Sequence, residues 1–572
     1  MLEGYVAVNP GVRLLRGHRV VIRADVQEYV TTGKVAVVFG GGSGHEPMHT
    51  GFVGKGMLTA CVCGSVFASP PPQEILPAIR AVAKNNTGGC LLLVANYTGD
   101  RLNFGLAFEK ARQEGIKIEM VTVAEDCALT SHVNTAGRRA LVGQVAISKI
   151  AGALAEEGRT LAEIVNITKD ALSNMGTIGL SLSACSVPGS GPTFSLGEGQ
   201  MELGLGAHGE AGVRRMKVTS AKEAVKIMLD HMTSPATSTH LRVESGDKVA
   251  CFLNNLGGTT LLEMNIIAKE IIQYLDARGV SVDRFYSGHI LTSLEMHGVS
   301  IMIMHLNDIL KQCLDAPTEV PHWPKPMLPR GSSDRKTPSP LDLPDVENIA
   351  IDTTTKTNRC FGEADASRTY DALKHACESL ISAETRLNTL DTEGGDGDTG
   401  STLARGAREI MKLLGTKNSP GLPVNNPSCL ALMLTSTAEN CMGGASGALY
   451  GLMFTAAASC LCDDLSPRVW DTVLKEAINI LKRYGGAEPG DRTMLDSLHA
   501  ASMTFSERLQ NMSPVDAYRE AVLAAEKAAC ETAKMSARAG RASYVNPDLL
   551  TQPDPGAVGV TIWMRAVLDS IQ

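Results

Sequence analysis

Lys34 to Phe39 (KVAVVF) is a run of apolar, mainly β-branched residues that leads directly into Gly40-Gly41-Gly42. Two further apolar runs follow, Cys90 to Ala95 (CLLLVA) and Ile116 to Val123 (IKIEMVTV), with helical stretches between them. Continuous apolar strands that alternate with helices are typical of a mostly parallel sheet covered on both faces. A second set of strands and helices starts near Asp247, so the first half of the chain is predicted to be an α/β domain with two lobes.

The second half of the chain changes to a helical pattern at about Arg359. Its apolar residues recur three and four positions apart, and β-branched runs are few. Residues 321–358 precede this pattern and are rich in Pro and Ser, which predicts an extended, semi-stiff linker. We expect the basic RGSSDRK stretch inside this linker to be solvated rather than a binding site. The predicted organisation is an α/β domain over 1–320, the linker over 321–358 and an all-α domain over 359–572.

The composition excludes several classes of protein. A net charge of −8 argues against a general binder of nucleic acids or of anionic membranes. The chain has no long apolar run that could span a membrane, and Met1-Leu2-Glu3-Gly4 lacks the basic and apolar regions of a signal peptide. The 14 Cys are scattered without paired metal-ligand spacing, which fits small buried thiols in a reducing cytosol. We therefore expect a cytoplasmic protein.

Asp391, Asp396 and Asp398 place three carboxylates close together in the stretch DTEGGDGDTGST. Hard cations prefer clustered oxygen ligands, and phosphates bind exposed backbone N–H groups beside such cations. The glycines and small hydroxyl residues of this stretch supply both kinds of group. We therefore expect a metal–nucleotide site, in a loop between the first two helices of the all-α domain.

Three segments of the α/β domain carry candidate catalytic groups. His45 lies in the glycine-rich stretch GGGSGHEP, which is a weak nucleotide signal alone and equally fits a tight structural turn. Asp100 follows the next strand, where a base would face a ligand held by that stretch. His208 lies between glycines, which leaves its ring open to act as a nucleophile or proton carrier, although taken singly it also fits an ordinary loop histidine.

Four later segments combine glycine with polar side chains. They are Met442–Gly447, Gly490–Asp496, Gly540–Tyr544 and Asp554–Ala557. Each one alone fits a helix cap or a turn. Together with the three aspartates they favour a pocket that binds an anion and a metal.

Taken together, the motifs resemble those of the single-chain, ATP-dependent dihydroxyacetone kinases, and look most like the animal triokinase/FMN cyclase branch of that family. The matching motifs keep their order along nearly the whole chain: GGGSGHEP, NYTGDRLNFG, SVPGS, ELGLGAHGE, GGDGD, GDRTMLDSL, GRASY and QPDPGA. The resemblance implies an α/β substrate domain, a C-terminal helical barrel that binds the nucleotide, and a homodimer. For the animal branch it also implies a protein partner in innate immune signalling.

The resemblance assigns roles to the candidate residues of the α/β domain. His208 would hold dihydroxyacetone or D-glyceraldehyde as a hemiaminal, Asp100 would act as the acid/base, and His45 would complete the catalytic set. Because such an adduct forms only with a carbonyl group, the site would accept short ketoses and aldehydes and exclude glycerol. Noncovalent contacts alone would discriminate poorly between these molecules. The substrate contacts implied by the resemblance are Gly42, Ser43, Gly44, His45, Ala95 and Asp100.

In the helical domain the resemblance implies that ATP is held through Mg²⁺ ions on Asp391, Asp396 and Asp398. Such cations bridge phosphate oxygens and offset the charge of the transition state. In the animal branch the same site also splits FAD to riboflavin 4′,5′-cyclic phosphate and AMP, with Mn²⁺ or Co²⁺. The implied nucleotide contacts are Thr399, Gly400, Ser401, Thr402, Ala445, Ser446, Gly485, Thr493, Met494, Arg541, Asp554, Pro555 and Gly556.

The chain departs from the family pattern at a few positions. Ala95 stands where the family has a lysine that hydrogen-bonds the substrate, and the loss of such a bond costs about 1.5–3 kcal/mol. Ala140 replaces a family glycine, Ala445 replaces a serine beside the nucleotide, and the segment before Val8-Asn9-Pro10 is short. These departures affect triose affinity more than nucleotide binding. Two alternatives to a triose kinase therefore stay open: an enzyme that mainly splits FAD, and a ligand-sensing protein with weakened kinase activity.

Overall fold

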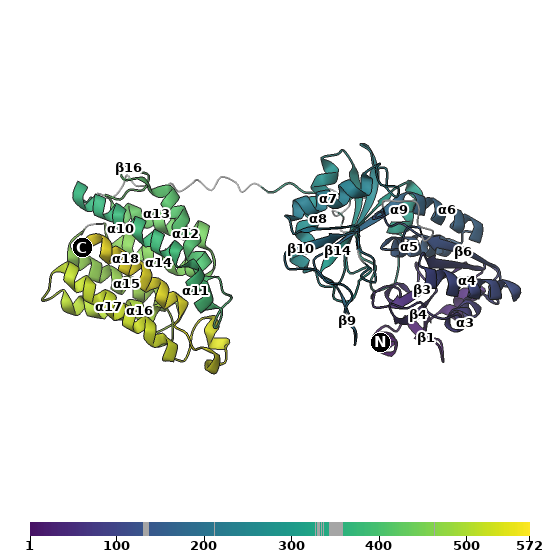
Figure 1. The fold of residues 1–572 in the computed structure, drawn as a ribbon, viewed down its shortest axis with the longest axis horizontal. Helices are drawn as coiled ribbons and strands as arrows, with labels where there is room; N and C mark the ends of the chain where they lie inside the picture. Colours follow the sequence, from purple (N-terminus) through teal and green to yellow (C-terminus); the bar gives the residue numbers. More distant parts are fainter. Residues whose placement is uncertain are drawn as a thin grey trace. The chain divides into compact units, whose positions relative to one another are not determined.

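The computed structural model of the protein describes residues 1–129, 137–210, 212–326, 328, 332, 335, 337–341, 359–462 and 464–572. It divides into two compact units, Met1–Pro340 and Leu341–Gln572, which Figure 1 colours from purple to teal and from green to yellow. Unit 1 is an α/β structure and unit 2 is helical, as the sequence pattern predicts. Within the described residues, no helix is long and apolar enough to cross a membrane.

The first sheet of unit 1 has the strand order β1-β2-β4-β3-β5-β6. Strands β4, β3, β5 and β6 are parallel, and β2 and β1 extend this sheet antiparallel at one edge. We expected Gly40 to Gly42 to follow the strand, but β3 includes them. Glycine is needed there because a Cβ on Gly40 would clash with the carbonyl oxygen of Val62 on β4. The strands are β1 (Val12–Leu14), β2 (Val20–Arg23), β3 (Ala36–Ser43), β4 (Ala60–Val66), β5 (Cys90–Ala95) and β6 (Ile118–Val123).

The second sheet has the order β11-β10-β7-β14-β12-β13 and is mainly antiparallel, since only β12 and β13 run parallel. The predicted start of this lobe near Asp247 is wrong, because the sheet also takes β7, β10 and β11 from earlier in the chain. Strand β7 is buried along its whole length and pairs with β14, which explains why it belongs here. The strands are β7 (Met175–Ser181), β10 (Gln200–Leu203), β11 (Arg214–Lys217), β12 (Lys248–Asn255), β13 (Ser281–Gly288) and β14 (Gly298–His305); β8 (Ser186–Val187) and β9 (Gly191–Pro192) form a separate pair.

Successive side chains of a strand face opposite sides of its sheet, and in unit 1 each side packs against a different set of helices. On β3, Ala36 and Val38 pack with helices α3 and α4, whereas Val37 and Phe39 face the core that contains α5, α6 and α9. Phe252 of β12 belongs to this same core, so one hydrophobic core joins the two sheets. The opposite face of the second sheet packs with α7 and α8. The helices are α1 (Leu2–Val8), α2 (Val26–Thr31), α3 (Pro72–Ala83), α4 (Thr98–Gln113), α5 (Gly143–Glu156), α6 (Leu161–Ser173), α7 (Ala221–Thr233), α8 (Leu261–Asp276) and α9 (Asp308–Asp315).

The chain after α9 packs on unit 1 before the Pro-rich stretch continues. Thr318 donates its hydroxyl to the carbonyl oxygen of Lys55 (2.8 Å), and Trp323 is 6% exposed in the core. Its ring lies 5.1 Å from that of Tyr286, centroid to centroid. The apolar side chains of this stretch thus anchor residues that the Pro content predicted to be linker. Of the basic RGSSDRK stretch, Arg335 donates to the carbonyl oxygen of Val282 (2.7 Å), and most of the remaining stretch lies outside the described residues.

Unit 2 is built from helices that pack on one another, with one two-residue hairpin of β15 (Gly415–Thr416) and β16 (Ser419–Pro420). Helix α10 packs on both α12 and α18, and each helix from α13 to α17 packs on the next one. The aspartate stretch lies between α11 and α12, rather than between the first two helices, because the chain breaks at Ala383. The helices are α10 (Glu363–Ser382), α11 (Glu384–Asp391), α12 (Thr399–Leu414), α13 (Pro427–Thr437), α14 (Gly444–Cys460), α15 (Pro467–Gly485), α16 (Met494–Arg508), α17 (Pro514–Glu531) and α18 (Pro555–Ile571).

Candidate functional site

The end of β3 is tied to the second lobe of unit 1 by backbone hydrogen bonds. The N–H of Leu294 donates to the carbonyl oxygen of Gly44 (3.0 Å), and that of Thr292 donates to the carbonyl oxygen of His45 (3.2 Å). Gly44 has φ of +98°, and a Cβ there would lie 2.8 Å from the ring of Phe67. Nearby, Ser43 donates its hydroxyl to the carbonyl oxygen of Gly64, and a Cβ on Gly42 would lie 2.8 Å from a backbone nitrogen. The glycines therefore let this loop pack closely against Phe67 and Ala68, while its backbone hydrogen bonds join the two lobes.

His45 is buried at this junction. Its Nδ1 lies 2.8 Å from the carbonyl oxygen of Thr292, so Nδ1 carries the proton and Nε2 has the free lone pair. Burial, together with repulsion from His208, lowers the pKa of His45 to about 4. The ring is thus neutral near pH 7 and able to accept a proton.

His208 lies in the turn after β10, edge-on to three other rings. The ring centroids of His45, Phe67 and Tyr97 lie 5.0, 5.2 and 4.9 Å from that of His208. Ser293 holds the turn by donating its hydroxyl to the carbonyl oxygen of Ala207 (2.6 Å). The His208 side chain is 25% exposed, so a small molecule can reach an imidazole that is otherwise surrounded by rings.

Asp100 lies in the first turn of α4 and is 7% exposed. Burial raises its pKa, while the hydroxyl of Ser69, 2.6 Å from Oδ1, and the nearby His208 act in the opposite direction. Ala95 is buried at the end of β5. The structure thus brings His45, His208 and Asp100 together beside the carboxyl ends of parallel strands, where α/β sheets bind ligands.

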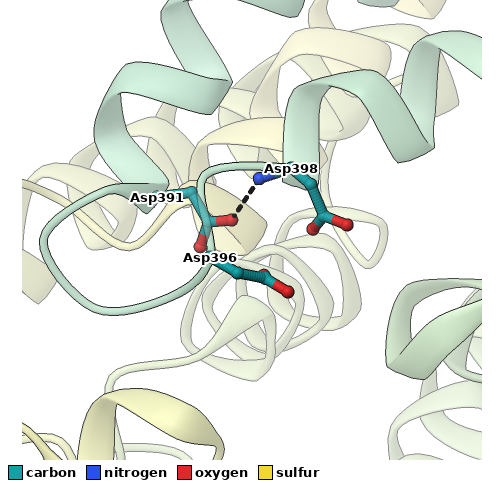
Figure 2. Close-up of side chains that lie close together, drawn as sticks. All are labelled: Asp391, Asp396 and Asp398. Atoms are coloured by element: carbon teal, nitrogen blue, oxygen red, sulfur yellow. Dashed lines mark hydrogen bonds between the residues drawn. The ribbon is translucent and has the colours of Figure 1, made fainter. Parts of the chain in front are cut away.

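The three aspartates of unit 2 also lie together (Figure 2). Ligand oxygens of Asp391, Asp396 and Asp398 all fall within 4.8 Å of one another. Asp391 is buried, and its Oδ2 accepts hydrogen bonds from the backbone N–H groups of Asp398 (3.0 Å) and Thr399 (3.1 Å). An all-carboxylate set of this size fits hard divalent cations such as Mg²⁺ or Mn²⁺.

The charges around this aspartate cluster are unevenly balanced. Arg541 forms an ion pair with Asp396, and this contact lowers the pKa of the Asp396 carboxyl. Desolvation and the neighbouring Asp396 charge raise the pKa of Asp398. Among the described residues, three carboxylates thus lie beside the one ion pair with Arg541, and this surplus of negative charge favours binding of a cation.

The predicted nucleotide residues lie at helix ends. Thr399 to Thr402 form the first turn of α12, directly after the aspartate cluster, and a Cβ on Gly400 would clash with the carbonyl oxygen of Glu384. The Ser401 hydroxyl is already engaged, because its Oγ donates a hydrogen bond to the Glu384 carboxylate (3.0 Å). Ala445 and Ser446 lie in the first turn of α14, and Gly485 ends α15 against Leu449 of α14.

The remaining predicted residues come from the starts of α16 and α18. Thr493 caps α16 in a capping box with Asp496, and Met494 begins that helix. A Cβ on Gly556 would lie 3.4 Å from the Cβ of Met494, so the two helix starts touch. Asp554 caps α18 through the N–H of Ala557 (2.7 Å), and burial raises its pKa to about 6.

Three charged residues in these motifs have contacts that the sequence did not predict. Glu393 accepts from Thr551 N, Thr551 Oγ1 and Gln552 N at 2.8, 2.9 and 2.9 Å. Arg492 is buried with φ of +63° and donates to the carbonyl oxygen of Gln552 (2.8 Å). Glu210 lies 3.0 Å from Nδ1 of His208. The sequence shows only that each of these charged residues lies inside a glycine-rich motif. It does not show which residue each one contacts.

Comparison with known proteins decides the family. The Dak1 domain model matches residues 3–322, and the DAK2 domain model matches residues 393–569. The chain belongs to the dihydroxyacetone kinase family. The resemblance inferred from the motifs is therefore confirmed.

Members of the dihydroxyacetone kinase family match along the full length of this chain. Triokinase/FMN cyclase of Homo sapiens is 45% identical, over 100% of this chain and 97% of its own. Dihydroxyacetone kinase of Citrobacter freundii is 35% identical, over 100% and 97%. The crystal structure of the C. freundii enzyme in its native form has a TM-score of 0.61 at 34% identity, covering 100% of this chain and 97% of its own. Its complex with AMP-PNP and Mg²⁺ has a TM-score of 0.59 with the same identity and coverage.

Proposed function

We propose that the protein phosphorylates dihydroxyacetone and D-glyceraldehyde with ATP, and that it also splits FAD to riboflavin 4′,5′-cyclic phosphate and AMP. The observation that carries the kinase proposal is the contact of the His208 ring with the ring of His45, at 5.0 Å, beside Asp100. The names of the full-length relatives, triokinase/FMN cyclase and dihydroxyacetone kinase, support the same pair of reactions.

The proposed triose chemistry follows from the three side chains. His208 adds to the carbonyl carbon and holds the triose as a hemiaminal. A neutral His45 accepts or returns a proton as that adduct forms and breaks, since its pKa of about 4 leaves Nε2 unprotonated near pH 7. In this proposal Asp100 accepts the proton of the hydroxyl that attacks the γ-phosphorus.

The proposed nucleotide site is the aspartate cluster with the first turn of α12. Asp391, Asp396 and Asp398 would hold Mg²⁺, which would supply positive charge to offset that of the phosphates. The backbone N–H groups of Thr399 to Thr402 stand at a helix N-terminus, which favours a phosphate. Arg541 adds a cation beside the cluster.

Finer features are proposed on family resemblance. They are a preference for Mn²⁺ or Co²⁺ in FAD cyclisation, a homodimer, a cytosolic location, a partner in innate immune signalling, and closure of the unit 2 helices into a barrel. For the barrel there is further support, because α10 contacts both α12 and α18 while α13 to α18 pack in succession.

The kinase proposal is tested with His208→Ala. We expect this variant to lose phosphorylation of dihydroxyacetone while it retains nucleotide binding and FAD cyclisation, because His208 lies in unit 1. His18→Ala is the matched control, since His18 is a partly exposed histidine of the same unit paired with Glu74. Unimpaired triose turnover by His208→Ala would overturn the assignment. A wild-type protein that binds trioses without phosphorylating them would favour the ligand-sensing alternative.

A further inference from the structure

Glu210 forms two contacts with His208. Its Oε1 lies 3.0 Å from Nδ1 of the His208 ring, and its Oε2 accepts from the His208 backbone N–H at 3.1 Å. Desolvation alone would raise the pKa of Glu210, but the hydrogen bond with His208 lowers it to about 2. Glu210 is therefore a carboxylate, which only accepts hydrogen bonds, so Nδ1 of His208 must carry the proton in this contact.

The surrounding structure fixes the carboxylate of Glu210. The N–H of Gly206 donates to the Glu210 carbonyl oxygen (3.1 Å), and a Cβ on Gly206 would clash with Glu210 Oε2 and lie 2.8 Å from Nη1 of Arg139. Arg139 is held in turn, since its Nε donates to the fully buried Asp126 (2.7 Å) and its Nη2 to the carbonyl oxygen of Gly204 (2.6 Å). The absence of a side chain at Gly206 thus leaves room for the Glu210 carboxylate and the Arg139 guanidinium beside the turn that carries His208.

We infer that Glu210 is a positioning residue that fixes the tautomer of His208, so that Nε2 presents its lone pair to the carbonyl carbon of the triose. A neutral imidazole can carry its proton on either nitrogen, and only the tautomer with the proton on Nδ1 leaves Nε2 nucleophilic. This inference rests on the proposed triose kinase function and adds a residue to which no role has been assigned above.

The covalent step explains why a carboxylate is required. As the Nε2–C bond forms, the π pair of the carbonyl moves to its oxygen, which takes up one proton from solvent through His45. The ring gains a positive charge, with its Nδ1–H still facing Glu210. A carboxylate at 3.0 Å stabilises that charge, in the way that the buried aspartate of a serine protease orients and stabilises its histidine.

The test compares Glu210→Gln and Glu210→Asp with wild type. The glutamine amide can donate as well as accept, so it no longer selects one tautomer, whereas aspartate keeps the charge on a shorter side chain. We expect Glu210→Gln to lower kcat/KM for dihydroxyacetone by roughly 10- to 100-fold, the size typical for removal of a residue that orients a ligand histidine. Glu210→Asp should recover part of the loss.

Two further measurements distinguish tautomer control from a structural effect. Native mass spectrometry of the full chain should show less covalent triose adduct in Glu210→Gln than in wild type, and FAD cyclisation in the same preparation should not change. Glu198→Gln is the matched control, because Glu198 is an exposed glutamate in the segment before β10. If Glu210→Gln fails to fold, Glu210→Asp alone must show the loss of adduct.

Wild-type adduct and wild-type kcat/KM in Glu210→Gln would overturn the inference. Equal impairment of Glu210→Gln and Glu210→Asp would also overturn it, since shape rather than charge would then matter. A wild-type protein with neither adduct nor triose turnover would instead refute the proposed kinase function.

Discussion

Ala95 ends β5 and is 4% exposed, at the position where the family pattern has a lysine. We predict that Ala95→Lys lowers KM for dihydroxyacetone by roughly tenfold or more, because a charged hydrogen bond to the substrate contributes about 1.5–3 kcal/mol. Steady-state kinetics with dihydroxyacetone and ATP measures this change. KM for ATP serves as the internal control and should not move. An unchanged KM for the triose would show that position 95 does not contact the substrate.

Glu125 provides a second prediction at the scale of one residue. It is fully buried after β6, its Oε1 accepts from the N–H groups of Leu141 and Gly143 (both 2.8 Å), and Oε2 has no hydrogen-bond partner among the described residues. Burial raises its pKa from 4.5 to about 7. Because the folded state holds a proton that the unfolded chain releases, the stability of unit 1 should fall as pH rises from about 4.5 to 7, by up to about 3 kcal/mol.

Glu125→Gln removes this titration, so the variant should lose less thermal stability between pH 5 and pH 8 than wild type. Glu119→Gln is the matched control, because Glu119 is exposed on β6, the strand that precedes Glu125. Scanning calorimetry at the two pH values measures the effect. Parallel pH dependence in wild type and Glu125→Gln would contradict the prediction.

At the scale of elements, Glu393 links the loop before α12 to the segment before α18. Its carboxylate receives three hydrogen bonds from Thr551 and Gln552, which precede the α18 cap Asp554. We predict that Glu393→Ala weakens ATP binding about tenfold, because the QPDPG segment would lose its tie to the aspartate cluster. Isothermal titration with ADP and Mg²⁺ measures the affinity.

Glu409→Ala is the matched control for Glu393→Ala. Glu409 is a partly exposed residue of α12 and pairs with Lys412 three residues on, and such surface pairs contribute little to stability. Equal ADP affinity in wild type and Glu393→Ala would show that the α18 start is positioned without this carboxylate.

The elements also show what the sequence could predict. β5 was predicted with its observed ends because its apolar run is bounded by turn residues, and the aspartate cluster was predicted because its members are near in sequence. The membership of β7 in the second sheet depends on pairing with β14, more than a hundred residues later, which no local pattern encodes. The sequence also does not predict the partners of Glu393 and Glu210. Thr551 is distant from Glu393 in sequence, and the contact of Glu210 with His208 depends on the conformation of a turn.

At the scale of the whole molecule, the two units have separate cores. The cores of unit 2 are formed by residues between Tyr370 and Leu568, and the cores of unit 1 are formed by residues between Val12 and Trp323. The aspartate cluster and the helix starts lie in unit 2, whereas His45, Asp100 and His208 lie in unit 1. FAD splitting requires a metal and a dinucleotide site, but it requires no triose, so it should depend on unit 2 alone.

We therefore predict that a fragment of residues 359–572 releases AMP from FAD in the presence of Mn²⁺, at a rate within a few-fold of the full chain, but does not phosphorylate dihydroxyacetone. Asp396→Asn in the same fragment is the control, because it removes one carboxylate of the cluster and should abolish AMP release. Chromatographic detection of AMP and cyclic phosphate measures the reaction. A folded fragment that binds ADP and Mn²⁺ yet leaves FAD intact would mean that unit 1 contributes to cyclisation, and the two reactions would then share more than the metal site.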